Sequence, residues 1–195
     1  MSIACIIAGY IVGSIPFAWL VARQLGTEDL RNAGSGNLGA ANVWRTSGAS
    51  AGLLVAALDI AKGVASVLVA ERFAAGDAVP AAAGAAAIIG HMYPVWLRLR
   101  GGKGVATACG VFAVLTPAAA LLAVGIFAVG VLTTKYVSVG SVLGSVALPL
   151  AAYGLGSSQP AVNAALGVSA LVVFRHRSNL VRVLEGTERR IGVRA

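Results

Sequence analysis

Long apolar segments alternate with short polar segments along this chain. The apolar pattern predicts membrane helices over Ser2–Ala22, Ala49–Ala70, Pro80–Leu97, Val139–Gly156 and Ala161–Phe174. A membrane-spanning helix needs about 20 apolar residues, and fewer where it is partly shielded. A membrane β-barrel would instead show short segments of alternating polarity. The pattern therefore predicts an all-α, polytopic integral membrane protein.

The apolar segment Val105–Thr133 is longer than a single span requires, and Pro117 lies near its middle. Two short helices hinged near Thr116–Pro117 would bring the total to seven transmembrane helices. A single long, tilted helix is the alternative.

Basic residues indicate how the chain is oriented. Lys and Arg total 15 against 7 Asp and Glu, and most of them lie in three polar segments, residues 23–48, 98–104 and 175–195. The loops predicted on the opposite side contain a single basic residue, Arg72. Because cytoplasmic loops of membrane proteins are enriched in Lys and Arg, the N-terminus is predicted outside and the C-terminus inside. This orientation requires residues 105–133 to cross an even number of times, which favours the hinged pair.

Composition supports a membrane protein and excludes several other classes. Hydrophobic residues make up 58 % of the chain and charged residues 11 %, whereas soluble domains carry about 25 % charged residues. An ordinary soluble domain, a disordered chain and a disulfide scaffold are thereby excluded. Cys5 and Cys109 stand alone in apolar segments and are interpreted as packing residues. No polar stretch could form a second, soluble domain, so residues 1–195 are expected to be a single transmembrane domain.

Polar residues gather in four stretches, all predicted at the cytoplasmic face: Asn32–Arg45, Gly90–Gly104, Lys135–Ser141 and Arg175–Glu188. Irregular polar backbone at membrane depth must be covered by protein or line a wet cavity. Four such stretches on one side predict a shared polar pocket.

The donors in these stretches indicate what the pocket binds. Gly34, Gly36 and Gly39 would allow backbone N–H groups to approach an anion closely. Arg45 offers a fork of donors and Lys103 a compact positive charge. Neutral donors and acceptors come from Ser35, Asn37, Asn42, His176 and Asn179. This set favours an anion such as phosphate over a cation.

Two segments match the residue letters of nucleotide-binding motifs but not the context or the complete pattern that those motifs require. The stretch Gly34–Gly39 reads GSGNLG, but its flanks are a membrane span and a polar loop, not the strand and βαβ unit of a dinucleotide site. The stretch Gly101–Gly104 reads GGKG, but Gly104 stands where a Walker A loop requires Ser or Thr.

The four stretches resemble one family. The segments GSGNLGAANVWR, Asp59-x-x-Lys62-Gly63, GHMYPVWLRLRGGKGVAT and RHRSNLVRVLEGTERRIG are similar to those of the bacterial membrane glycerol-3-phosphate acyltransferases that use acyl phosphate as donor. One departure is Ala41, where the family pattern would have Thr.

The resemblance implies an activity and a location. A fatty acyl group would pass from acyl phosphate to the 1-hydroxyl of sn-glycerol 3-phosphate, giving lysophosphatidate and phosphate, as the first acylation of bacterial phospholipid synthesis. The enzyme would lie in the bacterial cytoplasmic (inner) membrane with its active site on the cytoplasmic side. It would need no cofactor, metal or nucleic acid, and an acyl-phosphate-forming enzyme would supply its donor.

The resemblance also implies site residues. Ser35, Arg45, Lys103, His176 and Asn179 would be catalytic. Other substrate contacts would come from Gly34, Gly36, Asn37, Gly39, Asn42, Gly102, Gly104, Ser138 and Ser141. Because acyl phosphate is already an activated anhydride, positioning and charge stabilisation suffice and no covalent acyl-enzyme is expected. The proton of the attacking hydroxyl could go to His176 or to a substrate phosphate.

Some interpretations stay open in the sequence. Asp59 and Lys62 lie one helical turn apart, and either a structural ion pair or a substrate contact would explain them. His91 is expected to be structural. The competing function is a small transporter of phosphate compounds, which would need a site near the bilayer midplane with access from both sides.

Overall fold

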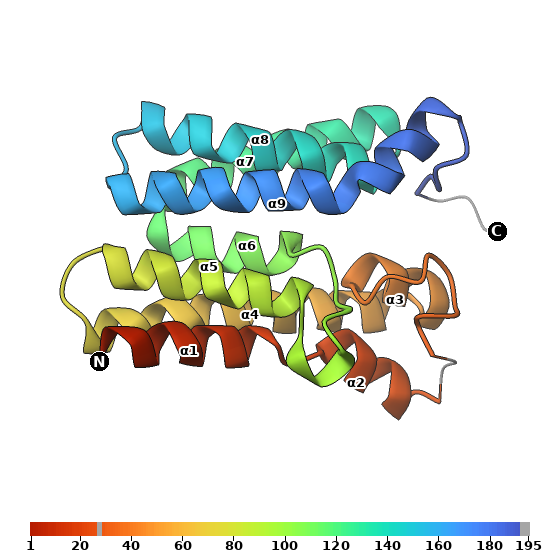
Figure 1. Ribbon diagram of the computed structural model, residues 1–195. Coiled ribbons are helices and arrows are strands. Elements are labelled where there is room, and N and C mark those ends of the chain that lie inside the picture. The colour runs from red at the N-terminus through yellow and green to blue at the C-terminus, as the bar shows by residue number, and fades with distance from the viewer. Residues whose placement is uncertain (27–28, 192–195) are drawn as a thin grey trace. The chain divides into compact units, whose positions relative to one another are not determined.

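In the computed structural model of the protein, which describes residues 1–26 and 29–191, all regular structure is helical. The helices are α1 (Ser2–Gly13), α2 (Phe17–Gln24), α3 (Ala40–Ser47), α4 (Ala49–Phe73), α5 (Ala78–Met92), the 3-10 turn η1 (Val95–Leu97), α6 (Val105–Leu115), α7 (Pro117–Thr134), α8 (Val137–Gly154) and α9 (Gln159–Leu184) (Figure 1). The described residues contain no strand, which confirms the all-α prediction.

Within the described part of the chain, five helical segments are long and apolar enough to cross a membrane: Ser2–Gln24, Ala49–Phe73, Ala78–Leu97, Pro117–Thr134 and Val137–Gly154. Large apolar side chains on α7 and α8 point outward, with Leu121 74 %, Leu132 67 % and Leu150 69 % exposed. Apolar surface of this extent suits lipid better than water. Helix α6 is shorter, with 11 residues. Helix α9 is long enough but is not among the five segments that are also sufficiently apolar. The count of seven crossings and the orientation remain predictions.

The chain forms two compact units, Met1–Leu115 and Thr116–Ala195. In the first unit, α1 packs against α4 and α5, and α4 packs against α5 and α6 (Figure 1). A methyl group added at Gly13 would collide with the Ala87 backbone, and one added at Gly110 would collide with the Ile60 backbone. Small residues therefore let the helix backbones approach closely, as in many membrane helix pairs.

The first predicted span is interrupted. Residues 2–22 were expected to form one helix, but α1 ends at Gly13 and α2 begins at Phe17. Proline lacks a backbone N–H and fixes its own φ, so Pro16 interrupts the helical hydrogen bonding here. The break exposes the carbonyl of Ile15 to a side chain from α4, as described below.

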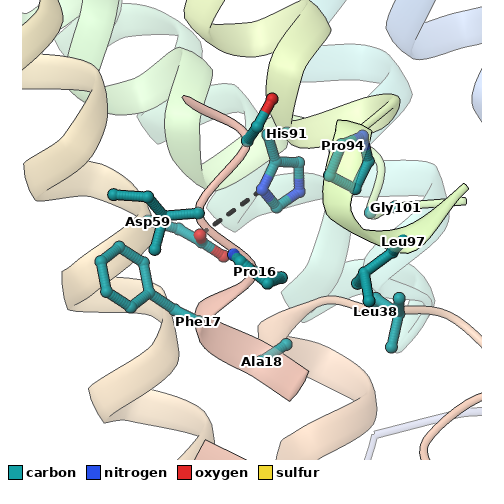
Figure 2. A pocket seen from close by; sticks show the side chains of 12 residues that line it. Pro16, Phe17, Ala18, Leu38, Asp59, His91, Pro94, Leu97 and Gly101 are labelled. Carbon is teal, nitrogen blue, oxygen red and sulfur yellow. Dashed lines mark ion pairs between the residues drawn. The ribbon is translucent and has the colours of Figure 1, made fainter. Parts of the chain in front are cut away.

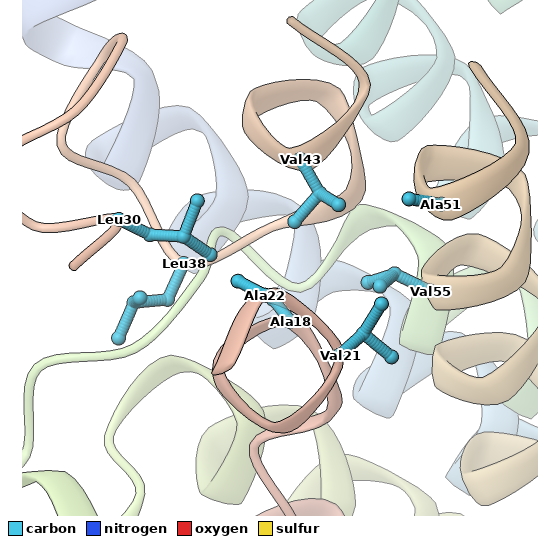
Figure 3. Packing of buried hydrophobic residues seen from close by; sticks show 8 residues of the cluster. All are labelled: Ala18, Val21, Ala22, Leu30, Leu38, Val43, Ala51 and Val55. Carbon is cyan, nitrogen blue, oxygen red and sulfur yellow. The ribbon is translucent and has the colours of Figure 1, made fainter. Parts of the chain in front are cut away.

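An apolar cluster holds the polar segment between α2 and α3 against the bundle (Figure 3). Its buried members are Ala18, Val21, Ala22, Leu30, Leu38, Val43, Ala51 and Val55. Leu30 and Leu38 belong to the polar segment itself and are only 1 % and 5 % exposed. Burying these two leucines fixes the first glycine-rich motif in place.

The second unit consists of α7, α8 and α9. Helix α8 packs against both α7 and α9, and Gly140 and Gly144 of α8 lie close to the backbone of α7 at Phe127 and Ala123. The predicted hinge is confirmed, because α6 ends at Leu115 and α7 starts with Pro117 at its first turn. The alternative of one long helix over residues 105–133 is therefore wrong.

The last helix corrects a predicted boundary. Residues from Arg175 onward were expected to form a polar tail, but α9 continues to Leu184. His176 and Asn179 therefore stand on a helix and not in an irregular loop. Similarly, Ser138 and Ser141 lie in the first turns of α8, and Asn42 and Arg45 lie on α3. The four polar stretches are thus partly helical, and this corrects their description as irregular loops.

Candidate active site

The first glycine-rich motif is a turn organised by one buried amide. The Asn42 side chain, 1 % exposed, accepts hydrogen bonds at Oδ1 from Ser35 N (2.7 Å) and from Ser35 Oγ (3.1 Å). Its Nδ2 donates to the carbonyls of Leu30 (3.2 Å) and Ala33 (3.1 Å). Gly34 has φ 61°, in the region that favours glycine. Asn42 was predicted to bind substrate, and these four side-chain hydrogen bonds shape the loop that presents Ser35.

The arginine of this motif faces outward. Arg45 lies in the last turn of the short helix α3 and is exposed. Asn37 and Gly39 immediately precede α3, with Gly39 in an extended conformation at the helix start. The chain thus carries the Ser35 hydroxyl and the Arg45 guanidinium on consecutive parts of one small, anchored segment.

The second motif is a glycine loop bonded to the end of α5. Gly101 N donates to Met92 O and Gly102 N donates to His91 O, both at 3.1 Å. Carbonyls in the last turn of a helix lack helical partners, so the loop satisfies two of them. A methyl group at Gly102 would collide with the His91 ring and the Leu38 carbonyl. Lys103, half-buried, follows directly, and Gly104 has φ 82°.

Three ionisable side chains meet beside this loop. Lys62 Nζ lies 2.7 Å from Asp59 Oδ1. His91 Nδ1 lies 3.4 Å from the same oxygen, the contact that Figure 2 marks with a dashed line. Lys62 Nζ is also 3.0 Å from His91 Nδ1 and donates to the Ile15 carbonyl at 3.0 Å. These contacts confirm the ion pair that the spacing of Asp59 and Lys62 suggested. The arrival of His91 beside the pair was not predicted.

A small pocket opens beside this trio, entirely within the first unit. It is lined by Ser14, Ile15, Pro16, Phe17, Ala18, Leu38, Asp59, His91, Pro94, Leu97, Gly101 and Gly102. Both glycine motifs therefore border one pocket, through Leu38 and through Gly101 with Gly102. The broken helix between α1 and α2 supplies its opposite wall.

In the second unit, one carboxylate from the tail collects three donors. Glu188 accepts at Oε1 from Ser138 Oγ (2.9 Å) and from Asn179 Nδ2 (2.6 Å). Its Oε2 accepts from Arg182 Nε at 2.8 Å. The Glu188 side chain is only 6 % exposed. Burial raises the pKa of this carboxyl, but the hydrogen bonds from Asn179, Ser138 and Arg182 outweigh it and leave the pKa below its ordinary value.

A glycine turn brings Glu188 to these donors. Gly186 has φ 70° and donates to Val183 O, while Thr187 N donates to Arg182 O. This pair of bonds with a left-handed glycine is the Schellman ending of a helix, which reverses the chain. Farther along, Ile191 N donates to Lys135 O at 2.9 Å. The tail thus folds back on the turn between α7 and α8.

The histidine of this unit is held by its own helix. His176, 3 % exposed, has Nδ1 2.8 Å from the Val172 carbonyl. A carbonyl only accepts, so Nδ1 carries the hydrogen and Nε2 carries the lone pair in the neutral ring. The His176 ring is therefore oriented so that Nε2 is the nitrogen able to receive a proton. In the same unit, Ser141 Oγ donates to the Val137 carbonyl at 2.8 Å.

The predicted site residues fall into two groups. The first unit holds Gly34, Ser35, Gly36, Asn37, Gly39, Asn42, Arg45, Gly102, Lys103 and Gly104, and the second holds Ser138, Ser141, His176 and Asn179. Within the second unit, Ser138 and Asn179 share Glu188. The contacts of Glu188 with Ser138 and Asn179, and the contact of His91 with the glycine loop, were not predicted from the sequence. The single pocket shared by all four stretches stays a prediction.

These features define a helical integral membrane protein with polar, glycine-rich motifs built around anchored cationic side chains. The family model described as glycerol-3-phosphate acyltransferase matches residues 3–186. The chain therefore belongs to the glycerol-3-phosphate acyltransferase family, and it is an acyltransferase of phospholipid synthesis. This confirms the resemblance found in the motifs.

Individual relatives agree with the family match. The chain is 43 % identical to a glycerol-3-phosphate acyltransferase of Syntrophotalea carbinolica, with 95 % of both chains covered. It is 44 % identical to that of Geobacter sulfurreducens, with 93 % of both covered. Crystal structures of PlsY (YgiH), an integral membrane glycerol 3-phosphate acyltransferase, are also similar. The glycerol 3-phosphate form has a TM-score of 0.93 at 38 % identity, covering 98 % of this chain and 96 % of that one. The lysophosphatidic acid form has a TM-score of 0.91 at 36 % identity, covering 98 % and 95 %.

Proposed function

We propose that this protein transfers a fatty acyl group from acyl phosphate to the 1-hydroxyl of sn-glycerol 3-phosphate. The products are 1-acylglycerol 3-phosphate (lysophosphatidate) and inorganic phosphate. The main support is its likeness over nearly the whole chain to PlsY, solved in glycerol 3-phosphate and lysophosphatidic acid forms. Acyl phosphate fits as the donor because the chain offers phosphate-binding cations and an activated donor needs no acyl-enzyme nucleophile.

The proposed reaction is a direct displacement at the acyl carbon. The 1-hydroxyl oxygen attacks the carbonyl carbon, the bond from that carbon to the phosphate oxygen breaks, and phosphate leaves with the bonding electrons. Arg45 and Lys103 hold phosphate oxygens and stabilise the charge that develops on the leaving group. Ser35, whose position is set by Asn42, contributes a hydroxyl to the same task. The glycines at positions 34, 36, 39, 102 and 104 and the side chains Asn37, Ser138 and Ser141 complete the proposed substrate-binding set.

The hydroxyl proton has two possible acceptors, His176 Nε2 and a substrate phosphate oxygen. We propose the substrate phosphate, because it lies on the reactant itself and an activated donor lowers the demand for a protein base. His176 and Asn179 then orient the substrate, and Glu188 holds the Asn179 amide at 2.6 Å. A His176→Ala variant should keep the pH–rate limb of the wild type. A general base would instead cost about 100- to 10,000-fold on removal, and the limb would vanish.

We further propose seven transmembrane crossings, with the N-terminus outside and the active site at the cytoplasmic face of the bacterial inner membrane. The distribution of Lys and Arg supports this orientation. Single cysteines at Asp77 and Ser158, in a variant lacking Cys5 and Cys109, should react with an impermeant thiol reagent from outside. Protection at both positions would invert the proposed topology.

The test of function uses purified protein in lipid nanodiscs with acyl phosphate and glycerol 3-phosphate. Lysophosphatidate and phosphate should form in equal amounts, and phosphate release should require both substrates. Phosphate release without glycerol 3-phosphate would indicate an acyl-enzyme or simple hydrolysis. No metal or nucleotide takes part in the proposal, so activity should persist in a metal chelator. Uptake of glycerol 3-phosphate into liposomes without lysophosphatidate would favour a transporter.

A further inference from the structure

Three ionisable side chains lie buried in the first unit and have no part in the proposed chemistry. Asp59, Lys62 and His91 are 1 %, 4 % and 8 % exposed. Ionisable groups inside a membrane helix are costly and usually mark a functional site or its supports. Asp59 and Lys62 satisfy each other's charge at 2.7 Å, so charge balance does not account for His91 beside them.

The contact with Lys62 orients the His91 ring. With Lys62 as the ammonium partner of Asp59, the 3.0 Å contact with Lys62 Nζ makes His91 Nδ1 the acceptor, because an ammonium group only donates. The ring hydrogen then lies on Nε2, and the 3.4 Å approach of Nδ1 to Asp59 Oδ1 is a contact and not a hydrogen bond. Lys62 is fixed in turn by Asp59 and by the Ile15 carbonyl at the break between α1 and α2. The position of the ring therefore depends on two segments, α4 and the break between α1 and α2.

The far edge of the same ring supports the glycine loop. A methyl group on Gly102 would collide with His91 Nε2, Cε1 and the Leu38 carbonyl. The Gly102 backbone also donates to the His91 carbonyl at 3.1 Å. The loop thus rests on the ring and the backbone of one residue, and the next residue along the chain is Lys103.

We infer that Asp59 and Lys62 act through His91 to position the Gly101–Lys103 loop for binding a substrate phosphate. The three are positioning residues, and this inference rests on the proposed role of that loop. The Gly101 and Gly102 N–H groups already donate to carbonyls of α5, so the loop serves phosphate binding by fixing the position of Lys103. A lysine ammonium binds phosphate only within hydrogen-bond reach. A ring that loses its partner shifts the loop and moves the Lys103 ammonium away from the phosphate.

The first test compares two substitutions at His91. His91→Phe keeps an aromatic ring of similar size but cannot accept from Lys62, whereas His91→Asn retains a side-chain oxygen near the position of Nδ1. Equilibrium binding of glycerol 3-phosphate to the purified protein in nanodiscs is the primary measurement. His91→Phe should raise Kd about 10- to 100-fold, the equivalent of one charge-assisted hydrogen bond. His91→Asn should recover part of that loss. In both variants KM should rise together with Kd, while kcat should change less.

The second test removes the ion pair without stranding a charge. Asp59→Leu combined with Lys62→Met replaces the pair by apolar side chains, which proteins often tolerate. This double variant should also raise Kd for glycerol 3-phosphate about 10-fold, because His91 loses its donor. Ser66→Ala is the matched control, since Ser66 is buried one turn farther along α4 and its hydroxyl donates to the Lys62 backbone oxygen, not to the Lys62 ammonium. Its Kd should stay that of the wild type.

The outcomes separate this inference from the proposed function. A folded double variant that binds glycerol 3-phosphate with the wild-type Kd overturns the inference, even if His91→Phe fails to fold. Raised Kd in the Ser66 control to the same extent also overturns it, because the effect would then be general loosening of the helix. If the wild type binds glycerol 3-phosphate but makes no lysophosphatidate, only the proposed function fails.

Discussion

The two units secure their polar ends in different ways. In the first unit, the motifs carrying Ser35 and Lys103 are held by many small interactions: the Asn42 amide, buried leucines, backbone bonds to the end of α5, and contact with His91. In the second unit, three donors from α8 and α9 converge on the single carboxylate of Glu188, which lies beyond the last helix. The first arrangement is distributed, and the second depends on one side chain.

This difference has consequences for tolerance to change. A distributed network loses one contact at a time, so a single substitution there should weaken binding without loss of the fold. A shared acceptor is different, because its removal leaves several donors unsatisfied at once, and an unsatisfied buried donor costs more than a made bond contributes. The most sensitive position outside the direct substrate contacts should therefore be Glu188.

Glu188→Ala should have the largest effect. It leaves Ser138, Asn179 and Arg182 without their acceptor, which we expect to destabilise the protein by about 2–4 kcal/mol. Activity should fall by about 100-fold or more, because the Asn179 amide loses its orientation. Thermal unfolding in nanodiscs and the initial rate of lysophosphatidate formation measure the two effects. Glu185→Ala is the matched control, since Glu185 is exposed and three residues away, and it should behave as the wild type.

Removal of a phosphate-binding cation should come next. In the proposed site, Arg45→Ala and Lys103→Ala would each remove a charge-assisted hydrogen bond to phosphate that contributes about 1.5–3 kcal/mol. Catalytic efficiency, kcat/KM, should fall about 10- to 150-fold. The unfolding temperature should change little, in contrast to Glu188→Ala. Arg72→Ala removes an exposed arginine from the last turn of α4, and full activity is expected. Equal losses in all three variants would point to net charge and not to these two side chains.

A smaller effect is expected when one contact of the first unit is disturbed. Gly102→Ala introduces a methyl group against the His91 ring and the Leu38 carbonyl. Both contacts are closer than real side-chain carbons make, so the loop or the ring must move to make room. KM for glycerol 3-phosphate should therefore rise about 10-fold, the equivalent of a weakened hydrogen bond. Gly167→Ala adds the same methyl group where nothing lies within 4 Å, so its KM should not change. An unaltered KM in Gly102→Ala would mean that the loop accommodates the methyl group without any effect on substrate binding.

The smallest effect concerns acid stability. The pKa of Glu188 is lowered in the folded protein by its three donors, despite burial, which acts in the opposite direction. Its stabilising contribution is therefore complete above its ordinary pKa of about 4.3 and is lost as pH falls through the folded value. Below about pH 4, unfolding temperature should decline more steeply for the wild type than for Glu188→Gln. Parallel declines would show that the carboxylate contributes no pH-dependent stability.

Several features could be read from the sequence because local chemistry decides them. Proline starts a helix well and cannot continue one, so Pro117 marked the hinge between α6 and α7. The spacing of Asp59 and Lys62 on one helix face made their ion pair a natural expectation. The motif residues led to the correct family because four separate stretches matched in order.

Other features could not be read because they depend on distant segments. The polar residues after Arg175 suggested a tail, but contacts with α8 keep α9 helical to Leu184 despite its charges. The role of Glu188 depends on the turn at Gly186, which brings it 50 residues back in sequence, to Ser138. Likewise, His91 reaches the Asp59–Lys62 pair through the packing of α4 against α5. Gly186 was the available signal, because glycine shortly after a helix often reverses the chain.

The central claim is acyl transfer from acyl phosphate to glycerol 3-phosphate, and oxygen labelling tests it most directly. Acyl phosphate carrying ¹⁸O in the oxygen that bridges carbon and phosphorus is mixed with glycerol 3-phosphate and the purified protein. Attack at the acyl carbon predicts that the label leaves entirely in inorganic phosphate, with one lysophosphatidate formed for each phosphate released. Label retained in a fatty acid, or labelled phosphate without lysophosphatidate, would contradict the account.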